Sequence, residues 1–278
     1  MAVPSESNAE SRVQRAARHP GVEVLARFGY AAKGVVYVVV GGLAVQAVLG
    51  AGGETTGEEG ALRAIGAQPF GRLLLWALAI GLVGYALWRF VEALLDVEAK
   101  GTGVAGLVSR GGYLASGVIH GFLALYAFKL ATGDGGGGEG GTESATAEAL
   151  TQPFGAWLVG LAGLAVIGYA GREAYRSYTR QYRREVAFGR LDLRVQRWID
   201  RTGRLGLASR SVVFGLIGFF LLAAALRSDP SQARGLEGAL DTLTRRPYGP
   251  WLLGIVAAGL VAYGVWSMVK ARYRVFPT

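Results

Sequence analysis

Six long runs without a charged residue alternate with short segments that hold most of the charges. The runs cover residues 34–53, 73–88, 111–128, 149–171, 211–226 and 247–269. A helix needs about 20 mostly apolar residues to cross the hydrocarbon core of a bilayer. The second and fifth runs are short by that measure, but arginines bound them, and an arginine stem can lie along the helix while its head reaches the interface. The pattern therefore predicts six membrane-spanning helices.

One helix pair occurs three times along the chain. Gln-Pro-Phe-Gly occupies residues 68–71 and again 152–155, and Arg-Pro-Tyr-Gly occupies 246–249; a tyrosine follows 14 residues after each final glycine. The matching positions are Pro69, Phe70, Gly71 and Tyr85 in the first copy, Pro153, Phe154, Gly155 and Tyr169 in the second, and Pro247, Tyr248, Gly249 and Tyr263 in the third. Proline suits the first turn of a helix, so each motif is expected to open the second helix of its pair.

The repeats define the expected architecture. Each copy enters the membrane from one side and returns to it, which predicts an all-α bundle of three parallel repeats with an approximate threefold axis along the membrane normal. The divisions are a polar N-terminal segment (1–23), the first repeat (24–98), a linker (99–106), the second repeat (107–178), a basic amphipathic linker (179–200), and the third repeat with its tail (201–278).

Composition and charge support a membrane protein and indicate its orientation. Half of the 278 residues (51%) are hydrophobic and 18% are charged, with a net charge of +9. Of the 29 lysines and arginines, 22 fall on the side that holds both termini. Basic residues near helix ends are retained in the cytoplasm, so both termini are expected to be cytoplasmic and the basic excess is not a sign of nucleic-acid binding.

The second linker is rich in arginine. Nine arginines lie between Arg176 and Arg204, interleaved with aromatic and aliphatic residues. We expect residues 178–200 to form a helix parallel to the membrane that binds anionic lipid head groups. A simple stop-transfer linker and a docking site for an acidic partner are the alternatives.

The residues from Phe28 to Tyr37, the three Pro-aromatic-Gly motifs and the segment Gly-Tyr-Ala-Leu-Trp-Arg from Gly84 resemble a bacterial membrane family called domain of unknown function 1206. That family is similar in having three tandem two-helix units. The resemblance covers nearly the whole chain after residue 24 and implies a multi-pass protein of the inner (plasma) membrane, but no activity. The middle copy departs most, since Ser116 replaces the basic residue and Arg172 the tryptophan of the other two copies.

Few ionisable residues fall within the spans. Lys33 and Arg210 are expected at the cytoplasmic ends, with their heads reaching the interface. His120 shares an aromatic position with Tyr37 and Phe214; it is expected to be a neutral histidine with one hydrogen bond across a helix interface, and a proton-linked or ligand-contacting group is the alternative.

Two repeated features lie toward the ends of the spans. The three repeat-matched tyrosines are expected to be equivalent anchors. Glu59, Glu143 and Glu237 belong to segments expected at the outer interface, and an acidic vestibule is the less favoured interpretation.

Known catalytic patterns are missing. Ser116 and His120 share a helix face, but that span holds no acid to complete a hydrolase triad. Without cysteine and with two histidines, neither a metal site of the usual type nor a cofactor is expected. The sequence favours a non-enzymatic structural or interaction component of the envelope; the alternative is a small transporter or channel along the threefold axis. A continuous polar path along the bundle axis would favour transport, and an axis filled by leucine, valine and phenylalanine would favour the structural interpretation. No protein partner is indicated.

Overall fold

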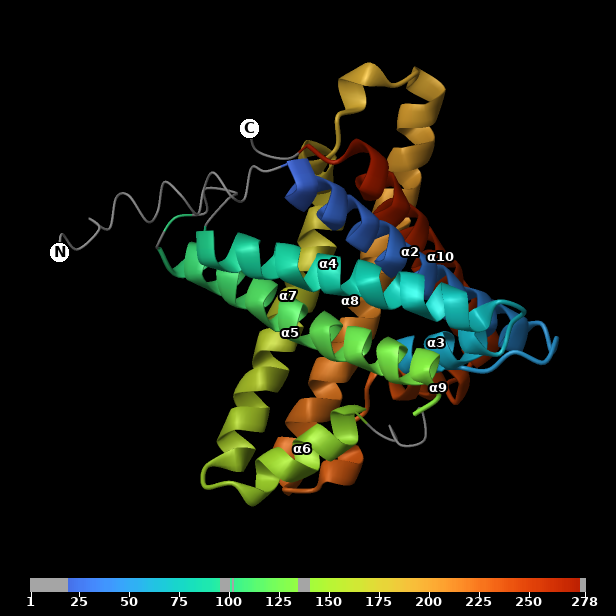
Figure 1. Cartoon of the computed structure of the whole chain (residues 1–278). Helices are drawn as coiled ribbons and strands as arrows, with labels where there is room; N and C mark the ends of the chain where they lie inside the picture. The colour runs from blue at the N-terminus through green and yellow to red at the C-terminus, as the bar shows by residue number, and fades with distance from the viewer. Residues whose placement is uncertain (1–19, 96–100, 102, 135–140, 276–278) are drawn as a thin grey trace.

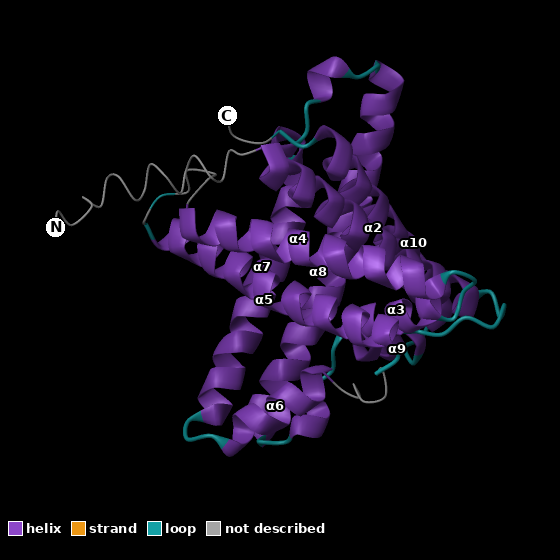
Figure 2. Ribbon diagram, in the orientation of Figure 1, coloured by secondary structure: helices purple, strands orange, loops and turns teal. Residues whose placement is uncertain are grey.

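The computed structural model describes residues 20–95, 101, 103–134 and 141–275. Most of the N-terminal segment, most of the first linker and residues 135–140 lie outside these residues. Six long helices are present: α2 (Pro20–Val48), α4 (Gly71–Leu95), α5 (Val104–Thr132), α7 (Gly155–Thr179), α8 (Leu193–Arg227) and α10 (Gly249–Tyr273). All six are long and apolar enough to cross a membrane, which confirms the predicted spans. The described part contains no strand (Figure 2).

A short helix precedes the second long helix of each repeat. These are α3 (Glu58–Gly66), α6 (Gly141–Thr151) and α9 (Leu236–Thr244). We call their end of the bundle the short-helix end, and the opposite end, where α2 begins and α10 finishes, the terminus end. Around Gly57, Gly141 and Gly235, the starts of α3, α6 and α9 approach one another.

The Pro-aromatic-Gly motif forms a tight turn before the helix, so the expectation that proline opens the helix itself is wrong. The amide of Gly71 donates to the carbonyl of Gln68 at 2.8 Å, with Pro69 and Phe70 between them. Phe70 has φ +61°, a left-handed conformation that is rare for an aromatic residue. The same turn recurs with Phe154 at +64° and Tyr248 at +61°.

The glycine that closes each turn is required by close packing. A Cβ atom on Gly71 would lie 2.2 Å from the carbonyl oxygen of Gly66, at the end of α3. Gly155 and Gly249 meet a backbone carbonyl at 2.0 and 2.1 Å in the same way. The aromatic rings of the motif point away from the protein and are about four-fifths exposed, which suits an anchor at the membrane interface.

The tightest helix pairs join different repeats. These are α4 with α5, α7 with α8, and α10 with α2, and in Figure 1 the α7–α8 pair runs across the direction of α4–α5. Within repeats, α2 packs on α4 and α8 on α10, whereas α5 and α7 form no packed pair in the described part of the chain. The contacts follow a cyclic order that is interrupted between α5 and α7.

Repeat-matched arginines reinforce this order at the terminus end. Arg27 on α2 donates to the carbonyls of Ala271 and Arg272 in the last turn of α10. Arg110 on α5 donates to the carbonyl of Ala93 in the last turn of α4. The last carbonyls of a helix lack partners within it, so a cation from the next repeat satisfies them.

The second linker does not form the expected surface helix. α7 ends at Thr179, followed by the short 3₁₀ helices η1 (Gln181–Glu185) and η2 (Phe188–Arg190). α8 then starts at Leu193, where Asp192 caps it by accepting the amide of Arg194, and continues without a break into the fifth span. Arg180 adopts a left-handed conformation that ends α7 and turns the chain under the bundle.

Candidate functional site

A cluster of cationic and aromatic side chains occupies the interior of the bundle. Its cations are Lys33 on α2 and Arg210 on α8, which are 2% and 6% exposed. Their heads therefore do not reach the interface, contrary to the sequence expectation. The reason is that each finds a tyrosine hydroxyl inside the protein, which replaces the water that it would otherwise need.

Lys33 is surrounded by tyrosines. Its Nζ donates to the hydroxyl of Tyr85 at 2.8 Å and lies 4.4 Å from the centre of that ring. The rings of Tyr37 and Tyr263 are each 5.8 Å away. In the described residues no carboxylate lies within ion-pair distance of Lys33.

Arg210 has a matching environment on the other side of the cluster. It donates to the hydroxyl of Tyr169 at 2.8 Å, and its guanidinium lies over the rings of Tyr263 and Phe214 at 4.6 and 4.7 Å. Glu173 is 3.6 Å from it. The buried Nε of Arg210 has no hydrogen-bond partner.

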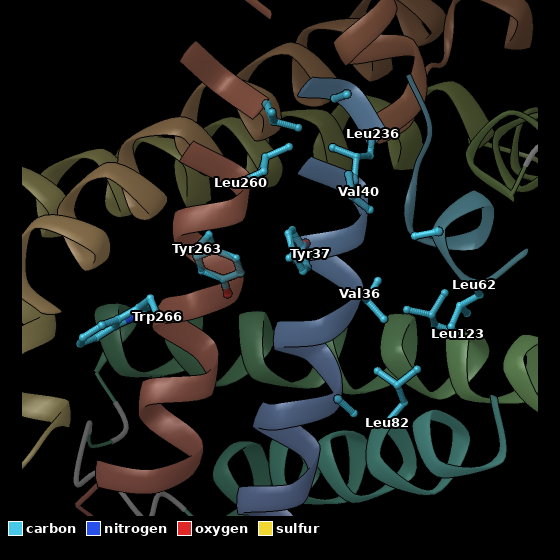
Figure 3. Packing of buried hydrophobic residues seen from close by; sticks show 14 of the residues in the cluster. Val36, Tyr37, Val40, Leu62, Leu82, Leu123, Leu236, Leu260, Tyr263 and Trp266 are labelled. Carbon is cyan, nitrogen blue, oxygen red and sulfur yellow. The ribbon is translucent and has the colours of Figure 1, made fainter. Parts of the chain in front are cut away.

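One aromatic contact recurs at each junction between repeats. Tyr37 packs on Tyr263, His120 on Tyr85 and Phe214 on Tyr169, with centroid distances of 4.8, 4.6 and 5.3 Å. Figure 3 shows Tyr37 and Tyr263 facing each other between α2 and α10. The predicted aromatic position is therefore a real junction contact.

His120 bonds within its own helix. Its Nδ1 lies 2.8 Å from the carbonyl oxygen of Ser116, one turn earlier on α5, so the expected hydrogen bond across a helix interface is not the one that it makes. The ring is buried. Its place in the cluster is fixed by stacking on Tyr85.

The three tyrosines converge but are not equivalent. Their hydroxyls lie within electrostatic range of one another. The Tyr85 hydroxyl accepts hydrogen bonds from two cations, Lys33 and Arg89, and the Tyr169 hydroxyl accepts from Arg210. The sequence located these residues by their repeat spacing but did not identify the cations that they hold.

A chain of polar side chains connects the cluster with the terminus end. Arg89 donates to the Tyr85 hydroxyl at 2.8 Å and pairs with Glu92 at 2.6 Å. Glu92 in turn pairs with Arg274 beyond the end of α10, at 2.5 Å. Glu92 is 1% exposed, so this network is buried within the bundle.

The linker closes the terminus end. Glu185 in η1 forms ion pairs with Arg176 on α7 and Lys270 on α10. Burial raises the pKa of the Glu185 carboxyl, but the positive charges of Arg176 and Lys270 outweigh it and lower the pKa to about 2. Beside it, Tyr182 is fully buried against Trp266. The linker therefore packs against the terminus end of the bundle. We call Glu185 and its ion pairs with Arg176 and Lys270 the Glu185 plug.

The short-helix end carries the acidic residues that precede the repeated motifs, Glu59, Glu143 and Glu237. The Tyr37 hydroxyl donates to Glu58 on α3 at 2.9 Å, which links the cluster to this end. Burial, with the nearby charges of Glu58 and Glu237, raises the pKa of Glu59 against the opposing effect of Arg63. Glu59 and Glu237 thus face each other, whereas Glu143 is exposed at the start of α6. In the described part no three acidic or imidazole groups are placed to hold a metal ion.

Comparison with known proteins identifies a family without an assigned role. The family model "Domain of Unknown Function (DUF1206)" matches the chain three times, at residues 28–96, 111–180 and 205–274. The chain is 34% identical over 257 residues to "Uncharacterized protein YxxB" of Bacillus subtilis (strain 168), and the match covers 92% of each chain. No solved structure matches. The chain therefore belongs to the DUF1206 family, whose model finds three tandem repeats in it.

Proposed function

Because the family carries no assigned activity, we propose a function from the polar interior: a small, non-enzymatic transporter of the plasma membrane with both termini in the cytoplasm. Its pathway starts at the half-buried Glu58 and follows the buried side chains of Tyr37, Lys33 and Tyr85 to Glu92 and Arg274. This is the second of the two functions that the sequence leaves open. The observation that carries the proposal is the pair of buried cations, Lys33 and Arg210, inside a bundle of apolar helices.

Energetics favour a role in transport over a structural one. A buried charge costs several kcal/mol of desolvation, and an apolar residue of similar size at the same place is often neutral or stabilising. Ionisable residues inside membrane spans accordingly mark substrate or proton pathways. The repeat architecture itself does not require a cation at this position, since the counterpart of Lys33 in the middle repeat is the uncharged Ser116.

Both ends of the pathway are closed by packed elements. Toward the short-helix end, Val40 and Leu260 lie one turn beyond the facing tyrosines, with Leu236 of α9 above them (Figure 3). Toward the terminus end, the Glu185 plug covers the cluster. We interpret this conformation as occluded, with α3 and α9 as one gate and the linker as the other.

Flux measurements test the proposal. Full-length protein in proteoliposomes should dissipate a gradient of protons, potassium or chloride, each followed with a specific fluorescent dye. Lys33→Gln should reduce that flux at least tenfold, whereas Lys129→Gln should leave it unchanged because Lys129 is exposed at the end of α5. Absence of flux for all three ions, together with a loss of stability in Lys33→Met, would instead favour the structural role.

We also propose that the basic linker binds anionic lipid head groups, although not as a surface helix. Arg180, Arg183 and Arg197 line a groove with Asp200 at its floor, and the Arg180–Asp200 and Arg183–Asp200 distances are long, at 3.5 and 3.7 Å. Each basic residue near an anionic surface contributes about 1 kcal/mol. Arg183→Gln with Arg197→Gln should weaken binding of phosphatidylglycerol to the full chain in nanodiscs, and equal binding of phosphatidylcholine by the native chain would refute the electrostatic attraction.

A further inference from the structure

We propose that Lys33 and Arg210 together bind a small monovalent anion of the halide or nitrate class. Only the passage of this anion across the membrane rests on the proposed transport function. The binding site consists of two buried cations from different repeats and the tyrosines between them. We call it the anion centre, defined by Lys33, Arg210, Tyr37 and Tyr263.

The two cations contact the same two tyrosine rings. Lys33 Nζ and the Arg210 guanidinium each lie 5.8 Å from the centre of the Tyr37 ring. Both also contact the Tyr263 ring, at 5.8 and 4.6 Å. The same two rings therefore separate and flank both cations, which brings charges from α2 and α8 within electrostatic range of each other.

The surrounding carboxylates do not balance this charge. Glu92 already pairs with Arg89 and Arg274. Glu173 pairs with Arg176 at 2.5 Å and reaches Arg210 at only 3.6 Å. Both carboxylates are thus engaged mainly by other cations, and because an unpaired buried charge is costly, a bound anion would stabilise Lys33 and Arg210.

Unused donors are available for the anion. An ammonium group has three N–H donors and a guanidinium five. Lys33 uses one on Tyr85, and Arg210 uses Nη1 on Tyr169. The Nε–H of Arg210 is buried and has no partner, so it is the most direct sign that a ligand belongs here.

The enclosure selects for a compact ligand of single charge. Five aromatic rings lie within 6 Å of one cation or the other: those of Tyr37, Tyr85, Tyr169, Phe214 and Tyr263. Aromatic walls supply few hydrogen-bond donors, so a strongly hydrated divalent anion such as sulfate would lose more water contacts than the anion centre can replace. Chloride and nitrate, which are more weakly hydrated, fit this balance.

Ligand-dependent stability tests the site on the full-length protein in detergent. Unfolding is followed at constant ionic strength in sodium chloride, nitrate, sulfate or gluconate. An anion that binds the native state raises stability in proportion to the logarithm of its concentration above its Kd. We expect the native chain to be stabilised by chloride and nitrate and not by sulfate or gluconate. Lys33→Gln and Arg210→Gln should each weaken the apparent affinity at least tenfold, and Lys129→Gln should not change it.

The outcomes separate this proposal from the proposed function. Equal responses to chloride and gluconate in the native chain, or an unchanged chloride response in Lys33→Gln, would overturn the anion centre. If Lys33→Gln does not fold, Arg210→Lys supplies the same test, since it keeps the charge but removes the Nε–H donor. Anion-dependent stability without flux in liposomes would refute transport alone, and flux through a protein whose stability responds equally to chloride and gluconate would refute the anion centre alone.

Discussion

Gly29, Gly112 and Gly206 share one repeat-matched position, and two of them lie at close contacts between the long helices of a repeat, so alanine substitution at this position distinguishes the repeats. A Cβ on Gly29 would lie 2.5 Å from the backbone nitrogen of Tyr85, and one on Gly206 would lie 2.5 Å from the Cα of Tyr263. Carbon atoms attract best at about 3.5–4.0 Å, so each helix pair must separate by roughly 1 Å. Gly112, the counterpart on α5, has no atom within 4 Å.

The expected costs follow from two opposing terms. Overpacking a tight contact costs about 1–3 kcal/mol, whereas replacing glycine by alanine inside a helix gains about 1 kcal/mol. Gly112→Ala should therefore be neutral or stabilising by up to about 1 kcal/mol. Gly29→Ala and Gly206→Ala should both be less stable than Gly112→Ala, by about 1–3 kcal/mol, because the propensity gain is common to all three.

Equilibrium unfolding in mixed micelles, followed by tryptophan fluorescence, measures these differences. Gly121→Ala is the matched control, because Gly121 is also on α5 and also meets nothing within 4 Å. A loss of stability at position 112 as large as that at 29 and 206 would refute the reasoning, since it would show that α5 and α7 pack as the other pairs do.

Three further outcomes follow from the contacts. Tyr85→Phe should cost more stability than Tyr169→Phe, because it removes two hydrogen bonds to cations instead of one, each worth about 1.5–3 kcal/mol; equal losses in unfolding titrations would contradict this. The pKa of Glu185 is lowered from 4.5 to about 2, so its ion pairs stabilise the fold above pH 4.5 and are lost as the pH falls toward 2; Glu185→Gln should flatten the stability profile in that window. In intact cells, Ser231→Cys should react with an impermeant thiol reagent and Arg184→Cys should not, and the reverse pattern would invert the proposed topology.

The sequence was sufficient for the architecture because the signals behind it are local. Uncharged runs of membrane length predict spans, and the repeated motif marks the start of each second helix. The prediction that Pro69 lies in the first turn of the helix was wrong, because Pro69 lies in the turn before α4. Proline at the first helical position and proline within a preceding turn are both favoured by its fixed φ, and only the left-handed Phe70 shows that the second applies.

The cationic interior was not predicted for a physical reason. A lysine 13 residues into α2 can either extend to the interface or turn inward, and sequence alone does not show which side of the helix faces protein. The decisive contacts, such as Lys33 with Tyr85 and Glu92 with Arg274, join residues that are 52 and 182 positions apart. The expectation of a surface helix in the linker was wrong for a related reason, since part of the apolar pattern of the linker reflects burial of Tyr182 and Val186 under the bundle.

The divergence of the middle repeat has a structural explanation in the gap between α5 and α7. Trp88 and Trp266 occupy one repeat position and are 3% and 1% exposed. The middle copy has Arg172 at that position, which is only half-buried. Where no partner helix packs, a tryptophan would present a large apolar ring without a cavity to fill, and an arginine can extend to the interface instead. The change from tryptophan to arginine in the middle repeat therefore coincides with the place where α5 and α7 do not pack on each other.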